Sequence, residues 1–291
     1  MEQTVIETKQ GTLRGAAGNG VISWKGVPYA QPPVGDLRFR APQPPETWTG
    51  TRDALAFGPI CPQPLYGEAS MFGSEAPPMS EDCLYLNIWA PEGERSNLPV
   101  TVWIHGGAFV TGAASIPLYE GTQFSLRGDC IVVSVNYRLG PFGFLHLSPL
   151  GQGFASNTGL LDQVLALEWV QGNIAAFGGD PENVTVFGES AGAMSIAALL
   201  AMPAARGLFR QAVMQSGAAQ AMNAAQAESV AASFIRLLGV DGGNLERLND
   251  LPASELLAAA DGVRRESDGG FLALPFQPVV EPGTLPADPL E

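Results

Sequence analysis

The stretch that decides the fold is Val184–Met202, VTVFGESAGAMSIAALLAM. Its apolar start, residues 184–187, has the length of a buried parallel strand, and the small apolar residues at its end have helical character. Between them lies GESAG, residues 188–192, a G-x-S-x-G pattern centred on Ser190. A strand that reverses into a helix so quickly holds Ser190 in a strained conformation with its hydroxyl facing outward. The pattern predicts a nucleophile elbow.

The two glycines of this motif and the helix behind it have separate roles. Gly188 and Gly192 stand where any Cβ would collide with the neighbouring strand and helix. The helix after Ser190 directs its free N–H groups and the positive end of its dipole toward the place where an oxyanion would form. A five-residue match also arises by chance. The strand before it and the helix after it favour the catalytic interpretation.

Composition and charge exclude several classes of function. With 46% hydrophobic and 15% charged residues among 291, the chain is globular rather than disordered. Its 15 basic and 29 acidic residues give a formal net charge of -14, which would repel nucleic acid and anionic membrane surfaces. Apolar runs are too short to span a bilayer. We therefore expect no nucleic-acid partner and no membrane partner. No metal-ligand pattern occurs in the sequence either, so we expect no metal site and no cofactor.

The N-terminus and the cysteines bear on the cellular compartment. Residues 1–15 lack a basic start followed by an apolar core, so we expect a cytoplasmic protein, or a secreted one if a leader was removed. Cys61 and Cys83 bracket a proline-rich stretch, whereas Cys130 stands in an apolar run. Free buried thiols and a Cys61–Cys83 disulfide are both consistent with this spacing.

The first 60 residues predict short extended segments. The turn residues 18–20, GNG, suggest a small antiparallel hairpin at the edge of the molecule. The stretch that follows is too rich in proline for a helix or a central strand, so it must be an ordered loop. Further along, two ion pairs with structural roles are expected, Arg38 with Glu81 and Arg138 with Asp162.

Strands and helices alternate along the rest of the chain. Buried strands are predicted near residues 84–89, 100–104 and 130–136, with a crossover helix at 158–176. This order predicts an α/β fold with a mostly parallel central sheet and helices on both faces. After the elbow we expect a strand at 209–215, helices at 224–238 and 253–260 that end at Gly239 and Gly262, and a tail from Pro275 without secondary structure.

The strand at 100–104 leads into HGGAF, residues 105–109. Two glycines after a buried strand let backbone N–H groups approach a ligand closely, so this loop suits the second half of an oxyanion hole. A tight turn without a catalytic role explains the same pattern equally well.

Four motifs occur along the chain: GVPYAQPPVGDLRFR, SEDCLYLNIW, VWIHGGAF and FGGDPENVTVFGESAG. In residues and order they resemble the type B carboxylesterases, the α/β-hydrolase branch that includes cholinesterases and bacterial para-nitrobenzyl esterases. The resemblance covers nearly the whole chain. It implies a single α/β-hydrolase domain over 1–291, incomplete at its C-terminus, with a hairpin and proline-rich loop over 1–60 and the start of a helical cap region over 218–291.

The resemblance also implies roles for individual residues. Ser190 would form the acyl-enzyme, and the backbone N–H groups of Gly107, Ala108 and Ala191 would form the oxyanion hole. Ala108 departs from the triple glycine common in the family. A backbone donor survives that methyl group, which mainly narrows the space beside the acyl group.

Other matched positions imply supporting roles. Glu189 and Ser216 would lie near the triad, and Gly188 and Gly192 would shape the elbow. Cys61 and Cys83 match the first disulfide loop of the family.

The triad of this family runs along the chain in the order nucleophile, acid, histidine. The sequence contains two histidines, His105 and His146, and both precede Ser190. We expect a structural hydrogen bond for His105 and a surface or packing role for His146. Acidic residues also follow Ser190, but none of these four has a context that matches the triad acid: Asp241, Glu255, Asp268 and Glu281.

The simplest explanation is that the chain is the amino-terminal part of a longer esterase. The triad acid and histidine would lie beyond residue 291, and the strand at 209–215 would be an apolar edge that a missing C-terminal segment covers. The residues present would by themselves give very weak activity.

The expected activity is hydrolysis of a carboxylic ester through a serine acyl-enzyme. A pocket lined by Phe109 would favour small to medium esters that are uncharged or aromatic. The alternative is a non-catalytic interaction protein, like the cholinesterase-like adhesion modules, or an inactive fragment.

Overall fold

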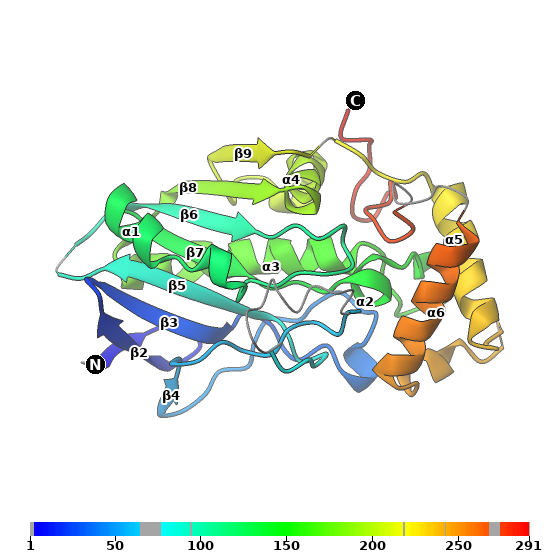
Figure 1. Cartoon of the computed structure of the whole chain (residues 1–291), viewed down its shortest axis with the longest axis horizontal. Coiled ribbons are helices and arrows are strands. Elements are labelled where there is room, and N and C mark those ends of the chain that lie inside the picture. The colour runs from blue at the N-terminus through cyan, green and yellow to red at the C-terminus, as the bar shows by residue number, and fades with distance from the viewer. Residues whose placement is uncertain are drawn as a thin grey trace.

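The structure of the protein is a computed structural model. It describes residues 3–64, 77–93, 95–217, 219–241, 243–267 and 274–290. Within these residues one sheet has the strand order β1-β2-β3-β5-β7-β6-β8-β9, with β4 beside β2 (Figure 1). The strands are β1 Gln3–Glu7, β2 Thr12–Gly18, β3 Val21–Pro28, β4 Thr51–Asp53, β5 Tyr85–Pro91, β6 Leu98–Ile104, β7 Ile131–Val135, β8 Gly179–Glu189 and β9 Gln211–Gln215.

The sheet is mixed, with four neighbouring parallel strands at one side and the short strand β4 parallel to β2 at the other. β7, β6, β8 and β9 are parallel neighbours, whereas β1, β2, β3, β5 and β7 pair antiparallel in that order. The predicted hairpin is confirmed as β2 and β3, with Asn19 and Gly20 at positive φ in its turn. The antiparallel part is larger than the sequence predicted, because β5 joins the hairpin to the parallel strands.

Helices cover both faces of the sheet, as expected. The six α-helices of the described residues are α1 Thr122–Gly128, α2 Gly140–Phe144, α3 Thr158–Asn173, α4 Ala191–Ala201, α5 Ala224–Leu237 and α6 Ala253–Glu266. On β7, Val133 belongs to the main core with α3 and α4, while Val132 packs with Trp89 on the face that α1 covers. This alternation follows from the two-residue period of a strand.

α6 differs from the prediction for this segment. The helix runs to Glu266, past Gly262, which was expected to end it. A Cβ on Gly262 would lie 2.8 Å from Cδ1 of Leu237. The glycine therefore allows α5 and α6 to approach each other, and it is a packing residue rather than a helix stop. Gly239, with φ of +62°, does follow the end of α5 as predicted.

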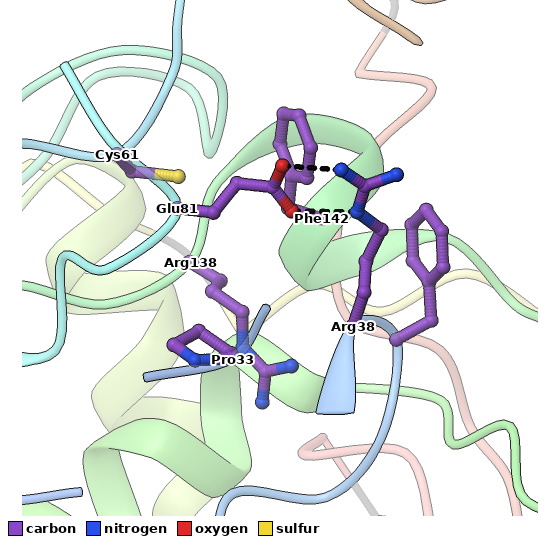
Figure 2. A pocket seen from close by; sticks show the side chains of 7 residues that line it. Pro33, Arg38, Cys61, Glu81, Arg138 and Phe142 are labelled. Atoms are coloured by element: carbon purple, nitrogen blue, oxygen red, sulfur yellow. Dashed lines mark hydrogen bonds and ion pairs between the residues drawn. The ribbon is translucent and has the colours of Figure 1, made fainter. Parts of the chain in front are cut away.

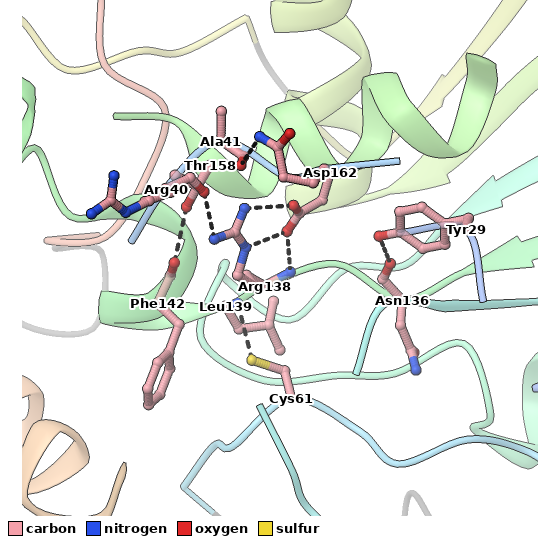
Figure 3. A network of polar contacts seen from close by, with 11 residues as sticks. Tyr29, Arg40, Ala41, Cys61, Asn136, Arg138, Leu139, Phe142, Thr158 and Asp162 are labelled. Atoms are coloured by element: carbon pink, nitrogen blue, oxygen red, sulfur yellow. Dashed lines mark hydrogen bonds and ion pairs between the residues drawn. The ribbon is translucent and has the colours of Figure 1, made fainter. Parts of the chain in front are cut away.

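Two ion pairs fix the proline-rich loop and the loop after β7, and both were predicted. Arg38 Nε donates to Glu81 at 2.7 Å, as Figure 2 shows, and Arg38 Nη1 donates to the carbonyl oxygens of Leu248 and Leu251. Arg138 and Asp162 form a fully buried pair with side-chain distances of 2.7 and 2.8 Å (Figure 3). These contacts tie the loops to the helices behind them.

The exposed edge of the sheet is β9. It is parallel to β8, and each of its five residues is exposed. The carboxyl ends of β6 and β8 point toward the end of the molecule where α5 and α6 lie (Figure 1). After α6, the described tail contains isolated bridges at Val279 and between Glu281 and Leu285 rather than a helix or strand.

Candidate active site

The elbow motif lies where β8 meets α4. β8 ends at Glu189 and α4 begins at Ala191, so Ser190 forms the turn between them. Its backbone has φ of 53° and ψ of -120°, a combination that costs a non-glycine residue about 1–3 kcal/mol. The Ser190 N–H donates to the Gln215 carbonyl, and its own carbonyl accepts from Met194 N–H, both at 2.9 Å. These two bonds hold the strained conformation in place.

The hydroxyl of Ser190 is not used by the helix that it precedes. A serine at this position usually accepts a hydrogen bond from a backbone N–H in the first turn. Ser190 makes no such capping bond, and the residue is partly exposed. Within the part of the chain that the structure describes, no hydrogen bond occupies its hydroxyl, which can therefore meet a reacting group.

The glycines of the motif fit against the end of β6. A Cβ on Gly188 would lie 2.7 Å from the carbonyl oxygen of Ile104, and one on Gly192 would lie 2.1 Å from the same atom. Real Cβ atoms do not approach a carbonyl oxygen this closely, so the packing of elbow on strand requires glycine at both positions.

The loop after β6 passes directly beside Ser190. A Cβ on Gly106 would lie 3.2 Å from the Cβ of Ser190 and 2.7 Å from the carbonyl oxygen of Glu189. The next three residues have positive φ: 113° at Gly107, 54° at Ala108 and 62° at Phe109.

This loop leaves backbone donors free. The carbonyl of Gly107 accepts from the N–H groups of Val110 and Thr111, at 3.0 and 2.9 Å. Among the described residues, no acceptor meets the N–H of Gly107 or of Ala108. Ala191 is the first residue of α4, so its N–H has no acceptor within that helix. The arrangement can stabilise a negatively charged oxygen.

His105 has a structural hydrogen bond, as predicted. Its Nδ1 donates to the Gly106 carbonyl at 2.8 Å, and its ring stacks on Tyr137 with 4.4 Å between centroids. Burial lowers the pKa of His105 to about 4, so the ring is neutral near neutral pH. Tyr137 Oη donates to the His105 carbonyl at 2.7 Å, which fixes the start of the loop.

His146 is a buried packing residue rather than a surface one. Its Nδ1 lies 2.7 Å from Ser156 Oγ, and Ser156 and Ser148 connect it to the Glu281 carboxylate. Of the other three acidic residues named above, Asp241 and Glu255 are exposed, and Asp268 lies outside the described residues. Neither histidine hydrogen-bonds to Ser190.

The two residues expected to support the site lie close to it. A carboxylate oxygen of Glu189 would be 2.9 Å from a Cβ on Gly106. Burial, and then the charge of Glu189, raise the pKa of Tyr119. Ser216 is exposed with φ of 54°, and a Cβ on the following Gly217 would lie 2.7 Å from the Ser190 carbonyl oxygen.

Phe109 does not line an open pocket, contrary to the expectation from the sequence. It is fully buried, and its ring packs on Phe144 with centroids 4.7 Å apart. The side chain therefore belongs to the hydrophobic core. The substrate preference that was based on Phe109 loses its support.

The cysteines are free and buried in the structure, so no Cys61–Cys83 bridge is present. A hydrogen bond with Cys61, and then burial, raise the pKa of Cys83. Cys61 Sγ accepts from Leu139 N–H at 3.3 Å (Figure 3). In the described residues there is no cluster of acids, histidines and cysteines that could hold a metal ion, and no helix long and apolar enough to cross a membrane.

The sequence did not indicate two residues that hold the loop after β6, Gln63 and Tyr137. Gln63 exchanges hydrogen bonds with the backbone of Gly112, and Tyr137 holds the carbonyl of His105. A tyrosine directly after a buried strand was a weak signal for the second contact. Nothing in the sequence around Gln63 indicates its partner, which lies 49 residues away.

Comparisons with known proteins agree with this geometry. The model of the carboxylesterase family matches residues 2–291. Para-nitrobenzyl esterase of Bacillus subtilis (strain 168) is 54% identical over 99% of this chain and 59% of its own length. Phenmedipham hydrolase of Pseudarthrobacter oxydans is 44% identical over 99% of this chain and 58% of its own length.

Solved structures show the same fold. A thermophilic PNB esterase superposes with a TM-score of 0.96 at 54% identity, covering 99% of this chain and 59% of that one. The α/β-hydrolase fold implied by the resemblance is thereby confirmed, and the chain spans just under three fifths of the length of these relatives. The chain belongs to the carboxylesterase family.

Proposed function

We propose that the complete protein hydrolyses carboxylic esters, with Ser190 as the nucleophile. The observation that carries the proposal is the strained turn at Ser190, which makes no cap bond and whose Cβ lies against Gly106 in the loop after β6. A reaction at the serine oxygen would explain why Ser190 is kept in a strained backbone conformation without a cap bond.

The reaction would proceed in two steps. Ser190 Oγ attacks the ester carbonyl carbon and loses its proton to a base, and the carbonyl oxygen becomes negatively charged. The N–H groups of Gly107, Ala108 and Ala191 would stabilise that oxygen. The intermediate collapses, the alcohol takes the proton and leaves, and water then releases the acid from Ser190. Glu189 and Ser216 would support this site from its two sides.

We place the base and the triad acid in sequence beyond residue 291. This is supported by the two histidines, because His105 is bonded to its own loop and His146 to Ser156. It is also supported by the relatives, which are longer than this chain. The exposed strand β9 leaves a sheet edge with which a further segment could pair. Residues 218–291 would begin the helical cap region.

We propose small uncharged esters with an aromatic alcohol as substrates. The support is the 54% identity to a para-nitrobenzyl esterase and the net charge of -14, which disfavours anionic substrates. The three free buried cysteines fit a reducing compartment, so we propose a cytoplasmic location, which fractionation would test.

The test is covalent labelling of the complete protein with a fluorophosphonate, followed by peptide mapping and assay with para-nitrobenzyl acetate. The expected result is a single adduct on Ser190 and turnover that S190A abolishes. An adduct elsewhere, or unchanged turnover in S190A, would contradict the proposal.

A non-catalytic interaction protein is the second candidate, favoured by the absence of a histidine bonded to Ser190. The coding sequence after Glu291 separates the two. A downstream acid and histidine favour the enzyme, and a stop codon favours the interaction protein.

A further inference from the structure

We infer that Gln63 is a positioning residue for the oxyanion loop, defined here as residues 105–112. The inference rests on the proposed function, because it concerns the N–H groups of Gly107 and Ala108. It assigns to Gln63 the task of holding the end of this loop, from a segment that is distant in sequence.

The side chain of Gln63 is hydrogen-bonded at each of its polar atoms. It is 3% exposed. Its Oε1 accepts from Gly112 N–H at 2.7 Å, while its Nε2 donates to the Gly112 carbonyl at 2.9 Å and to the Cys61 carbonyl at 3.0 Å. The amide thus pairs with both backbone groups of one residue, as a neighbouring strand would.

Gly112 is the point at which the loop returns to its own beginning. It has φ of +108°, and a Cβ there would lie 2.5 Å both from the Gly106 carbonyl oxygen and from His105 Nδ1. A Cβ on Gly107 would lie 2.2 Å from the Thr111 carbonyl oxygen. The two ends of the loop are therefore in contact, and a shift of Gly112 would displace Gly106 and Gly107.

The turn inside the loop links the position of Gly112 to the N–H groups that would bind an oxyanion. Gly107 directs its carbonyl toward Val110 and Thr111, which leaves the N–H groups of Gly107 and Ala108 without acceptors among the described residues. Donors that bind a developing charge must be held within a fraction of an ångström. Tyr137 holds the first residue of the loop through the His105 carbonyl, and Gln63 holds the last.

The competing interpretation is that Gln63 only contributes stability. Its loss would leave two backbone groups of Gly112 buried and unpaired, which lowers the free energy of unfolding in either case. The two interpretations predict different effects on how tightly the enzyme binds the transition state. A positioning role lowers kcat and the affinity for a transition-state analogue together, while KM changes little.

The experiment compares Q63M and Q63E with Q171M in the complete protein. Gln171 is a matched control, because its Nε2 donates to two carbonyls, of Pro181 and Leu208, outside the oxyanion loop. Q63E keeps the shape and one acceptor for Gly112 N–H, and it serves if Q63M does not fold. The measurements are kcat and KM on para-nitrobenzyl acetate, affinity for an aryl trifluoromethyl ketone, the midpoint of thermal unfolding, and amide hydrogen exchange of peptides covering 105–112.

For Q63M and Q63E we expect kcat and ketone affinity to fall by about 10- to 100-fold with KM within about two-fold, and exchange at 105–112 to accelerate. Q171M should lower the midpoint of thermal unfolding while leaving kcat, KM, ketone affinity and hydrogen exchange at 105–112 unchanged. Unchanged kcat and exchange in a folded Gln63 variant, or equal losses in Q171M, would overturn the inference. If the wild-type protein turns over no ester, the proposed function fails, and the exchange data still decide whether Gln63 holds the loop.

Discussion

Gly106 lies against Ser190 so closely that a methyl group on Gly106 would stand 3.2 Å from the serine Cβ. The strand-to-helix turn after β8 and the loop after β6 therefore meet at van der Waals distance. Two segments separated by more than eighty positions are brought together because β6 and β8 are parallel neighbours whose carboxyl ends coincide.

We expect G106A to displace this loop and to lower kcat. The added methyl would also stand 2.7 Å from the Glu189 carbonyl oxygen, a backbone atom that cannot rotate away. The assay is kcat and the rate of fluorophosphonate labelling. G151A is the control, since its Cβ would meet Phe154 at an ordinary 3.4 Å. Wild-type labelling by G106A would contradict the contact.

We expect S190G to be more stable than S190A, although both lack the hydroxyl. Glycine relieves the strain at φ of 53°, worth about 1–3 kcal/mol, and loses about 0.5–1 kcal/mol through its more flexible unfolded chain. Urea unfolding should show a net gain of about 1 kcal/mol for S190G. An S190G variant that is less stable than S190A by about 0.5–1 kcal/mol would mean that the turn is unstrained.

We expect D162N to destabilise the protein by about 3–5 kcal/mol, because it leaves the buried guanidinium of Arg138 without its counter-ion. D53N removes an exposed partner of Arg14 and should change stability little. Urea unfolding of both variants provides the comparison. Similar effects of the two substitutions would contradict the burial of the Arg138–Asp162 pair.

We expect part of the acid sensitivity to come from His105. Burial lowers its pKa in the folded protein from 6.5 to about 4. The unfolded state therefore binds the proton first, and stability that is fully present above pH 6.5 is lost as the pH falls toward 4, by about 3 kcal/mol at most. The unfolding free energy of H105N should fall less than that of wild type between about pH 7.5 and about pH 5. Identical slopes would refute this assignment.

We expect the three cysteines to be protected in the folded protein and to react with a thiol reagent on denaturation. Cys61, Cys83 and Cys130 have exposed fractions of 3%, 0% and 4%. Titration with a chromogenic disulfide under non-reducing conditions counts the thiols. Recovery of Cys130 alone after denaturation would show that Cys61 and Cys83 are bridged.

The sequence alone determined the elements that depend on local pattern. The apolar run before G-x-S-x-G and the small residues after it specify β8 and α4, because chain reversal at Ser190 needs glycine on both sides. The hairpin at Asn19 and Gly20 follows from the same kind of local constraint, a turn that requires positive φ.

Tertiary structure decided what depends on contacts between distant segments. Gly262 lies within α6, where Leu237 of α5 occupies the space that a Cβ would fill. Phe109 is buried because it packs on Phe144 of α2, a contact between separate segments that periodicity does not reveal. Gln63 reaches Gly112 from another segment altogether. Periodicity and turn chemistry are local properties of the chain, whereas packing and hydrogen-bond closure are satisfied only when all segments are in place.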